Sequence, residues 1–189
     1  RALLQSVCNR VAVGYRMAWV AVLDGAAGAL SLAGITGAHQ DYLDCLGSSL
    51  AAGAAGEGSI GAALRSRRPV VVNDFARDAR MAPWRSAAER RGFRAKVALP
   101  MVRHDEALGI LNIYSVEPDA FDSEEVALLQ GLAERVGAAI QTYRYRAARH
   151  HAQAALRLRE RALEYQAHYD SLTGLPNRVL LYQRLAQAI

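Results

Sequence analysis

The sequence lacks the features that mark membrane proteins and metal-dependent proteins. No apolar run approaches the roughly 20 residues that a membrane-spanning helix needs, and no secretory signal peptide is visible. Only two cysteines occur, Cys8 and Cys45, without a CxxC or Cys/His spacing. Isolated cysteines are typical of small buried hydrophobic side chains rather than of redox or metal sites. We therefore expect a cytoplasmic segment with no membrane contact and no metal site.

A pattern typical of nucleic-acid binding is also missing, although the net charge is +5. Six arginines against two glutamates fall between Tyr143 and His168, so most of the positive excess lies in one segment. Such an excess is typical of a solvated helix face. No basic patch with interleaved aromatic residues occurs in the remaining sequence. We therefore expect no nucleic-acid partner.

What is present is ordinary globular composition, with 52% hydrophobic and 22% charged residues. A length of 189 residues accommodates one domain of roughly 100–150 residues plus an extension. The sequence begins at Arg1 rather than at a start methionine, so we expect it to be a piece of a longer protein.

Short apolar runs rich in β-branched residues predict a set of strands, at 16–24, 29–36, 69–75, 96–102 and 108–115. Helices are predicted between them, at 42–55, 59–67 and 85–91. The helices interrupt the strands without a regular βαβ alternation. This order favours an α+β domain with an antiparallel sheet.

After Phe121 the pattern changes to that of one long helix, from Ser123 to about His168. Asp122 and Glu125 resemble a capping box at its start, and the helix contains no proline. A stripe of apolar or near-apolar residues follows at spacings of three and four: Leu129, Leu132, Val136, Ile140, Tyr143 and Ala147 and, after the pair His150-His151, Ala154, Leu158, Ala162, Tyr165 and Tyr169. Such a helix would be roughly 70 Å long, more than one domain can cover. A second copy of the chain is the simplest partner, and we expect a parallel homodimer.

The most specific motif lies at the C-terminal end, where residues 168–178 read HYDSLTGLPNR. This string resembles the DxLTGLPNR motif that opens GGDEF domains, the catalytic domains of diguanylate cyclases. The resemblance implies that Asp170, Thr173, Asn177 and Arg178 form the turn that docks a helical linker onto the catalytic domain. It also implies a parent enzyme that needs Mg²⁺ and converts two GTP into cyclic di-GMP and two pyrophosphates.

The catalytic groups of such a domain are absent from these 189 residues. No GG[DE]EF string, no paired carboxylates for two Mg²⁺ ions and no phosphate-binding glycine loop occur. We expect no catalytic residue and no cofactor in this chain, which by itself should be inactive.

A second resemblance covers residues 1–142. It is carried by GSIGAA (58–63), RPVVVND (68–74), VALPM (97–101), LGILNI (108–113) and the start of the long helix (121–140), in that order. Together these segments resemble a GAF domain, a sensory domain related to PAS domains. The resemblance implies a five- or six-stranded antiparallel sheet, with helices on one side and a small-molecule pocket on the other. It leads us to divide the chain into a GAF-like domain (1–142), a helical linker (143–169) and the start of a GGDEF domain (170–189).

The identity of the ligand is not encoded in a recognisable motif. Cyclic-nucleotide-binding and bilin-binding signatures are both missing, and His39 and His104 are lone histidines in polar loops. The segment 73–85 combines an acid, arginines and aromatics in a loop, where binding residues tend to lie. The candidate ligand-binding residues are Asp74, Phe75, Arg80, Trp84 and Tyr114. The alternative is that Asp74 caps a turn, that Trp84 fills the core, and that Tyr114 is a core residue.

Three functions are compatible with these patterns. The first is a ligand-sensing domain that controls a C-terminal diguanylate cyclase through a dimeric helical linker. The second is a ligand-free dimerisation scaffold. The third is a regulator of a degenerate GGDEF domain that a phosphodiesterase domain follows.

Overall fold

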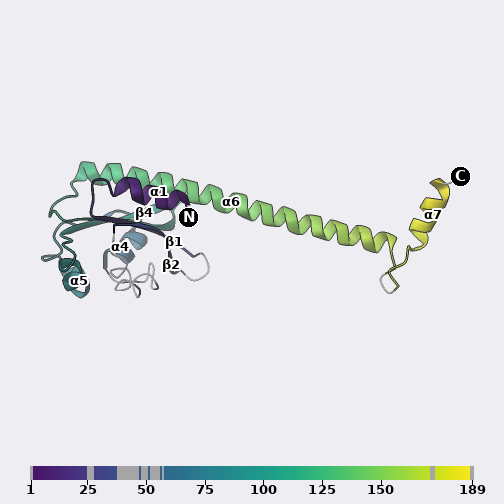
Figure 1. Ribbon diagram of the computed structural model, residues 1–189, viewed down its shortest axis with the longest axis horizontal. Helices are drawn as coiled ribbons and strands as arrows, with labels where there is room; N and C mark the ends of the chain where they lie inside the picture. Colours follow the sequence, from purple (N-terminus) through teal and green to yellow (C-terminus); the bar gives the residue numbers. More distant parts are fainter. Residues whose placement is uncertain are drawn as a thin grey trace. The chain divides into compact units, whose positions relative to one another are not determined.

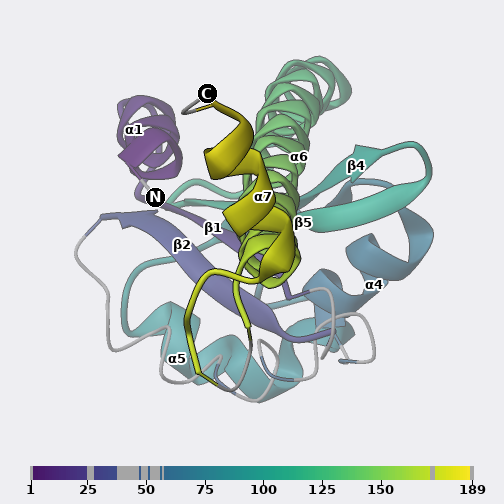
Figure 2. The same cartoon turned by 90° about the vertical axis from the view of Figure 1, so that its right-hand side faces the viewer.

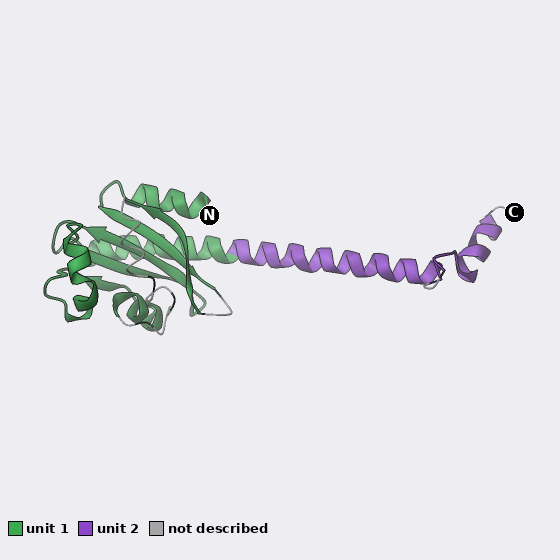
Figure 3. Ribbon diagram, turned by 60° about the horizontal axis from the view of Figure 1, so that its bottom comes forward, with its two compact units in different colours: residues 1–141 green, residues 142–189 purple. Residues whose placement is uncertain are grey.

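The computed structural model describes residues 2–24, 28–37, 47, 51, 56, 58–170 and 173–187. The chain divides into two compact units, Arg1–Gln141 and Thr142–Ile189 (Figure 3). No helix among the described residues is both long and apolar enough to cross a membrane.

The first unit is built on a five-stranded sheet. Its strands are β1 (Met17–Leu23), β2 (Leu30–Thr36), β3 (Val70–Val72), β4 (Ala95–Arg103) and β5 (Glu106–Ser115). They lie in the order β2-β1-β5-β4-β3, and every neighbouring pair is antiparallel. The predicted α+β class with a five-stranded antiparallel sheet is therefore confirmed.

Helices cover both faces of this sheet (Figures 1 and 2). In chain order the helices are α1 (Ala2–Val11), α4 (Gly58–Ser66), the 3₁₀ helix η2 (Ala79–Trp84), α5 (Arg85–Glu89), α6 (Ser123–His168) and α7 (Arg178–Gln187). One face carries α1 and the first part of α6, and the other carries α4, η2 and α5. Because alternate residues of a strand point to opposite faces, the central strands contribute to two separate cores.

The two cores divide the residues of β4 and β5 between them. The α6-side core contains Val97 and Leu111, together with Leu129, Val136 and Ile140 of α6. Fully burying an aliphatic side chain of this size contributes about 1.5–3 kcal/mol. The first part of α6 is therefore fixed by its own apolar stripe, as the sequence pattern predicts.

On the opposite face lies the α4-side core. It contains Trp19, Phe75, Phe93 and Tyr114, together with Ile60 and Leu64 of α4. Tyr114 makes ring contacts with Phe93 at 5.0 Å and with Phe75 at 6.4 Å between centroids. Residues far apart in the sequence thus converge on β5, at the centre of the sheet.

The start of α6 is held by its own cap and by polar contacts to Tyr15 and to Asn73, the residue after β3. Asp122 Oδ1 accepts a hydrogen bond from Glu125 N at 2.8 Å, so the predicted cap is present. In a complete capping box, the Glu125 carboxylate would also accept a hydrogen bond from Asp122 N. Here it accepts a hydrogen bond from the Tyr15 hydroxyl instead. Asn73 donates to Phe121 O at 3.1 Å and accepts from Phe121 N at 3.3 Å.

Three elements differ from the predictions, and a fourth is not tested. The 3₁₀ helix η2 lies in the segment 73–85 that was predicted to be a loop. Helix α1 was not predicted from the sequence. Strand β3 spans only Val70–Val72 rather than 69–75, because Asn73 turns to bond Phe121 and Asp74 begins a turn. The helix predicted at 42–55 lies largely outside the described residues.

Two glycines provide a matched test of this packing. A Cβ on Gly109 of β5 would lie 2.3 Å from Ala21 O, whereas a Cβ on Gly131 of α6 meets nothing within 4 Å. We expect Gly109→Ala to lower the free energy of unfolding by about 1–3 kcal/mol through overpacking. We expect Gly131→Ala to raise it by about 0.5–1 kcal/mol through helix propensity. Urea unfolding measures both, and equal effects would contradict the packing at β5.

Candidate functional site

The predicted ligand segment 73–85 leaves the end of β3 and crosses the sheet face that carries the α4-side core. Phe75 N donates to Arg94 O at 2.9 Å, which ties the segment to the residue before β4. Arg85 Nε donates back to Phe75 O at 3.2 Å. The segment is therefore an ordered part of the fold.

Asp74 has the geometry of a turn cap. Its Oδ1 accepts a hydrogen bond from Ala76 N at 2.9 Å, and its backbone carbonyl accepts from Asp78 N at 3.0 Å. Its carboxylate also lies 3.5 Å from Arg77 Nε, whose side chain is 89% exposed. These contacts agree with the capping alternative that the sequence left open, and ligand binding by Asp74 stays a prediction.

Arg80 is engaged by its own segment. Its guanidinium pairs with the Asp78 carboxylate and also donates to Val71 O at 3.1 Å. The hydrogen bond from Arg80 holds the pKa of Asp78 below its usual value. Asp78 in turn accepts from Arg80 N at 2.9 Å and caps η2. This pair fixes the start of η2 against β3.

The three aromatic candidates contribute to the α4-side core. Phe75 and Tyr114 are 1% and 0% exposed, and Trp84 is half-buried against the same cluster. Trp84 lies so close to Gly58 that a Cβ there would come within 2.9 Å of the indole ring. The structure therefore brings Phe75, Trp84 and Tyr114 to one sheet face, while Asp74 and Arg80 form local contacts.

Two buried polar residues on this face were missed by the sequence prediction. Lys96 of β4 is 1% exposed, and its Nζ lies 5.0 Å from the centroid of the Tyr114 ring. Asn112 of β5 is 0% exposed, and neither its Nδ2 nor its Oδ1 has a hydrogen-bond partner among the described residues. The available signal was a polar residue among apolar neighbours in each of the two strands.

Burial perturbs the charge of Lys96. Desolvation lowers the pKa of its ammonium to about 7, because a charged group is disfavoured away from water. No carboxylate among the described residues forms a salt bridge with it. The α4-side face thus holds an amine that gains or loses its charge near neutral pH.

The DxLTGLPNR turn lies in the second unit. Asp170 Oδ1 accepts from both the backbone N and the hydroxyl of Thr173, each at 2.9 Å. Asn177 donates to Ala167 O at 2.7 Å, and its Oδ1 accepts from Leu180 N at 3.1 Å, which caps α7. Gly174 adopts a positive φ of 69°, which glycine tolerates without strain. The turn residues are therefore brought together by their own hydrogen bonds.

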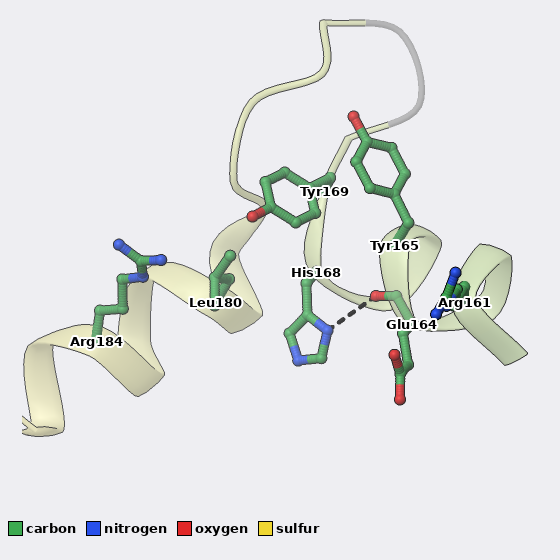
Figure 4. A pocket seen from close by; sticks show the side chains of 7 residues that line it. All are labelled: Arg161, Glu164, Tyr165, His168, Tyr169, Leu180 and Arg184. Atoms are coloured by element: carbon green, nitrogen blue, oxygen red, sulfur yellow. Dashed lines mark hydrogen bonds between the residues drawn. The ribbon is translucent and has the colours of Figure 1, made fainter.

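Arg178, the last predicted docking residue, lies over the ring of Tyr182 with Cζ 5.9 Å from its centroid. An open groove of about 390 Å³ lies beside the turn, between the end of α6 and α7 (Figure 4). Tyr165 and Tyr169 stack in it at 4.6 Å, and His168 Nδ1 donates to Glu164 O at 2.9 Å. The groove is exposed helix surface beside the turn.

The described part of the chain holds no group of three His, Cys, Asp or Glu side chains that could bind an ion. These residues offer no site for the Mg²⁺ that the GGDEF resemblance implies for the parent enzyme, and the need for Mg²⁺ stays a prediction. Cys8 is a free, buried cysteine, whose thiol pKa is raised to about 11 by burial. His104 lies in the exposed β4–β5 turn, and His39 and Cys45 lie outside the described residues.

A family model described as "GAF domain" matches residues 1–141. A search among curated proteins found no match.

Solved structures share the fold at low sequence identity. The GAF domain region of a Geobacter sulfurreducens PCA protein has 21% identity and a TM-score of 0.60, over 75% of this chain and 92% of that one. The GAF domain of a phosphoenolpyruvate-protein phosphotransferase from Coxiella burnetii has 21% identity and a TM-score of 0.60, over 78% and 85%. Free methionine-R-sulfoxide reductase from Neisseria meningitidis has 18% identity and a TM-score of 0.59, over 76% and 79%. Identities this low show a common fold.

The role of Asp74 can be tested without a ligand. Asp74→Ala removes the acceptor for Ala76 N, and we expect it to lower the free energy of unfolding by about 1 kcal/mol. Asp74→Asn keeps an acceptor oxygen and should change it by less than about 0.5 kcal/mol. Thermal melts of the ligand-free protein measure both variants. An unchanged melting point for Asp74→Ala would speak against the cap and for the predicted ligand role.

Lys96 predicts a specific dependence of stability on pH. Its pKa is about 7 in the folded protein against 10.5 for the unperturbed amine, so the unfolded chain binds more protons between these values. Stability should therefore rise with pH across this window, with a slope of up to about 1.4 kcal/mol per pH unit. Lys96→Met, which keeps an unbranched side chain, should remove this contribution.

The free energies of unfolding of the wild type and Lys96→Met are best compared between pH 7 and pH 9. Above pH 9, the unperturbed pKa of a thiol, the raised pKa of Cys8 means that the unfolded chain loses this proton first. The contribution of Cys8 to stability then falls with pH and opposes that of Lys96. We expect the advantage of Lys96→Met over the wild type to shrink from pH 7 to pH 9. A constant difference would show that Lys96 stays charged in the folded protein.

Proposed function

The chain belongs to the GAF domain family, whose members are sensory and regulatory domains, and from that premise we propose that it controls a C-terminal diguanylate cyclase. The GAF domain would sense a small molecule at the sheet face that carries α4. The long helix would act as a dimeric linker, and residues from Asp170 onward would begin the catalytic domain. The longer protein would join two GTP molecules into cyclic di-GMP.

One observation carries this proposal: a single helix joins the GAF fold to the DxLTGLPNR turn. Helix α6 runs without interruption from Ser123 to His168, and the turn follows at once. Asn177 N donates to His168 O at 2.8 Å, and Asp170 N donates to Leu175 O at 2.8 Å. The turn residues that the motif specifies are thus bonded to the last turn of α6 and to one another.

A physical route leads from the proposed sensing face to α6 through β4. Lys96 and Ala98 of β4 lie on the α4 side, whereas Met101 of the same strand belongs to the α6-side core. A Cβ on Gly137 of α6 would lie 3.3 Å from Met101 Cβ, so helix and strand are closely packed there. Gln130 also donates to Pro100 O at 3.2 Å. A shift in the position of β4 would therefore alter the packing of α6.

Exposed apolar residues support the proposed homodimer. Beyond Gln141, α6 exposes large apolar side chains within the second unit: Tyr143, Tyr145, Leu156, Leu158, Leu163 and Tyr165. Leu158 and Tyr165 continue the stripe whose earlier members pack on the sheet. Pairing with a second copy would cover this stripe. Because the reaction joins two GTP molecules, pairing the protomers would also bring two GTP sites together.

Helix α7 supports a continuing catalytic domain. Its exposed apolar residues are Val179, Leu181, Tyr182 and Leu185. A helix of ten residues with this many exposed apolar side chains needs a covering surface. In our proposal the remainder of the GGDEF domain provides it.

Two leucines of α6 offer a matched test. Leu158 lies on the apolar stripe and is 67% exposed, whereas Leu156 lies off the stripe and is 57% exposed. We expect Leu158→Glu to weaken the dimer by tenfold or more, since burying a leucine contributes about 1.5–3 kcal/mol. Leu156→Glu should leave the dimer intact. Light scattering of the 189-residue chain over a concentration series measures this.

The same variants test the enzymatic part in the longer protein. With GTP and Mg²⁺ we expect cyclic di-GMP from the wild type and from Leu156→Glu, and a reduced rate from Leu158→Glu. The 189-residue chain alone should form no product. A longer protein that makes no cyclic di-GMP under any of these conditions would refute the assignment to a cyclase.

A further inference from the structure

Two buried polar groups on the α4-side face are not explained by the fold. Asn112 is completely buried in the central strand, yet its amide nitrogen and oxygen both lack partners among the described residues. A buried polar group without a hydrogen bond destabilises the folded protein by about as much as the loss of a hydrogen bond does. Such groups are rare in native proteins. Lys96 is buried in the adjacent strand without a described carboxylate.

The sheet register places these two residues together. Asn112 pairs with Ala98, and Lys96 pairs with Tyr114, so Lys96 and Asn112 are diagonal neighbours on β4 and β5. Diagonal pairs on one face of a sheet are within reach of long side chains. Asn112 lies between Ile110 and Tyr114, which both belong to the α4-side core, so its side chain shares their face.

We propose that Lys96 and Asn112 form the polar part of a binding site for a small monocarboxylate. The carboxylate would pair with the Lys96 ammonium, and a hydroxyl or amide of the same molecule would bond the Asn112 amide. This assignment rests on the proposed sensory function and names the chemistry of its ligand.

The charge and the surroundings determine the class of ligand. One ammonium offsets one negative charge, so a monoanion fits better than a phosphate that carries two. The neighbouring side chains Trp19, Phe75, Phe93 and Tyr114 are aromatic, which favours a ligand with an apolar or aromatic body. Trp19 lies directly opposite Asn112 on β1, and its Nε1 is 3.4 Å from the Tyr114 hydroxyl.

The lowered pKa of Lys96 agrees with this role. Burial alone lowers the pKa of this amine, and no described carboxylate pairs with it. A nearby carboxylate would favour its charged form. Anion binding would therefore restore the charge of Lys96 and supply the missing partner. In the same way, the ligand's neutral group would satisfy the Asn112 amide.

Three acids and their neutral amides form the probe set: benzoate, phenylacetate and salicylate against benzamide, phenylacetamide and salicylamide. Isothermal calorimetry with the 189-residue chain gives their dissociation constants. We expect at least one acid to bind about tenfold or more tightly than its own amide. If no acid binds better than its amide at millimolar concentration, the proposal is overturned.

Two variants separate the roles of the residues. Lys96→Met should abolish the preference for the acid over its amide. Asn112→Leu should weaken the binding of an acid and of its amide by the same factor, so the preference for the acid should remain. For salicylate and salicylamide, which carry a hydroxyl group, we expect the affinity to fall by about tenfold. Both replace a buried polar group by an apolar one of similar size, so both should fold. If Asn112→Leu only raises stability and leaves all affinities unchanged, the amide has no ligand role and the site is refuted.

The test of this binding site can be distinguished from the test of the cyclase assignment. Binding that requires Lys96, in a longer protein without cyclase activity, would support this site and refute the enzymatic assignment. A cyclase that depends on Leu158, with no acid bound by the GAF domain, would do the reverse.

Discussion

Strand β5 lies at the centre of the sheet, hydrogen-bonded to β1 on one side and to β4 on the other, and both of its faces are covered. Ile110 and Tyr114 point into the α4-side core, whereas Leu111 and Ile113 point into the α6-side core. A one-residue slip would exchange the two sets. The register of β5 therefore fixes both the proposed sensing face and the surface on which α6 packs.

The same constraint connects the fold to the linker. Helix α6 begins where Asn73, at the end of β3, holds the backbone of Phe121. It then packs on β4 through Gln130 and Gly137. Beyond Gln141 the helix belongs to the second unit, whose turn is held by Asp170 and Asn177. Continuity of one helix lets a single element take part in both units.

Sequence patterns were sufficient where one physical rule dominated. Alternating and continuous apolar runs located all five strands, and the spacing from Leu129 to Ile140 gave the buried face of α6. They failed for α1 and η2. They also failed for the end of β3, where a side-chain contact to Phe121 outweighs the β propensity of the run.

The candidate site was less accessible to the same rules. Loop composition pointed to Asp74 and Arg80, yet a loop sequence does not reveal whether an acid bonds its own backbone, as Asp74 does. Lys96 and Asn112 were not predicted as site residues, because an apolar run predicts a strand whether or not it contains a polar residue. Only the strand pairing shows that the two lie on one face and are both buried.

Among the described residues, Lys96 has no counter-charge and Asn112 has no hydrogen-bond partner. A buried amine and a buried amide in this state both favour the unfolded chain, and an apolar residue at either position would avoid this penalty. A ligand that binds only the folded state stabilises it by mass action. A carboxylate bound to Lys96 would therefore stabilise the strand pair β4–β5 most directly. Strand β4 also contacts α6 through Met101. A ligand bound at Lys96 and Asn112 would therefore alter the strand surface on which the linker helix packs.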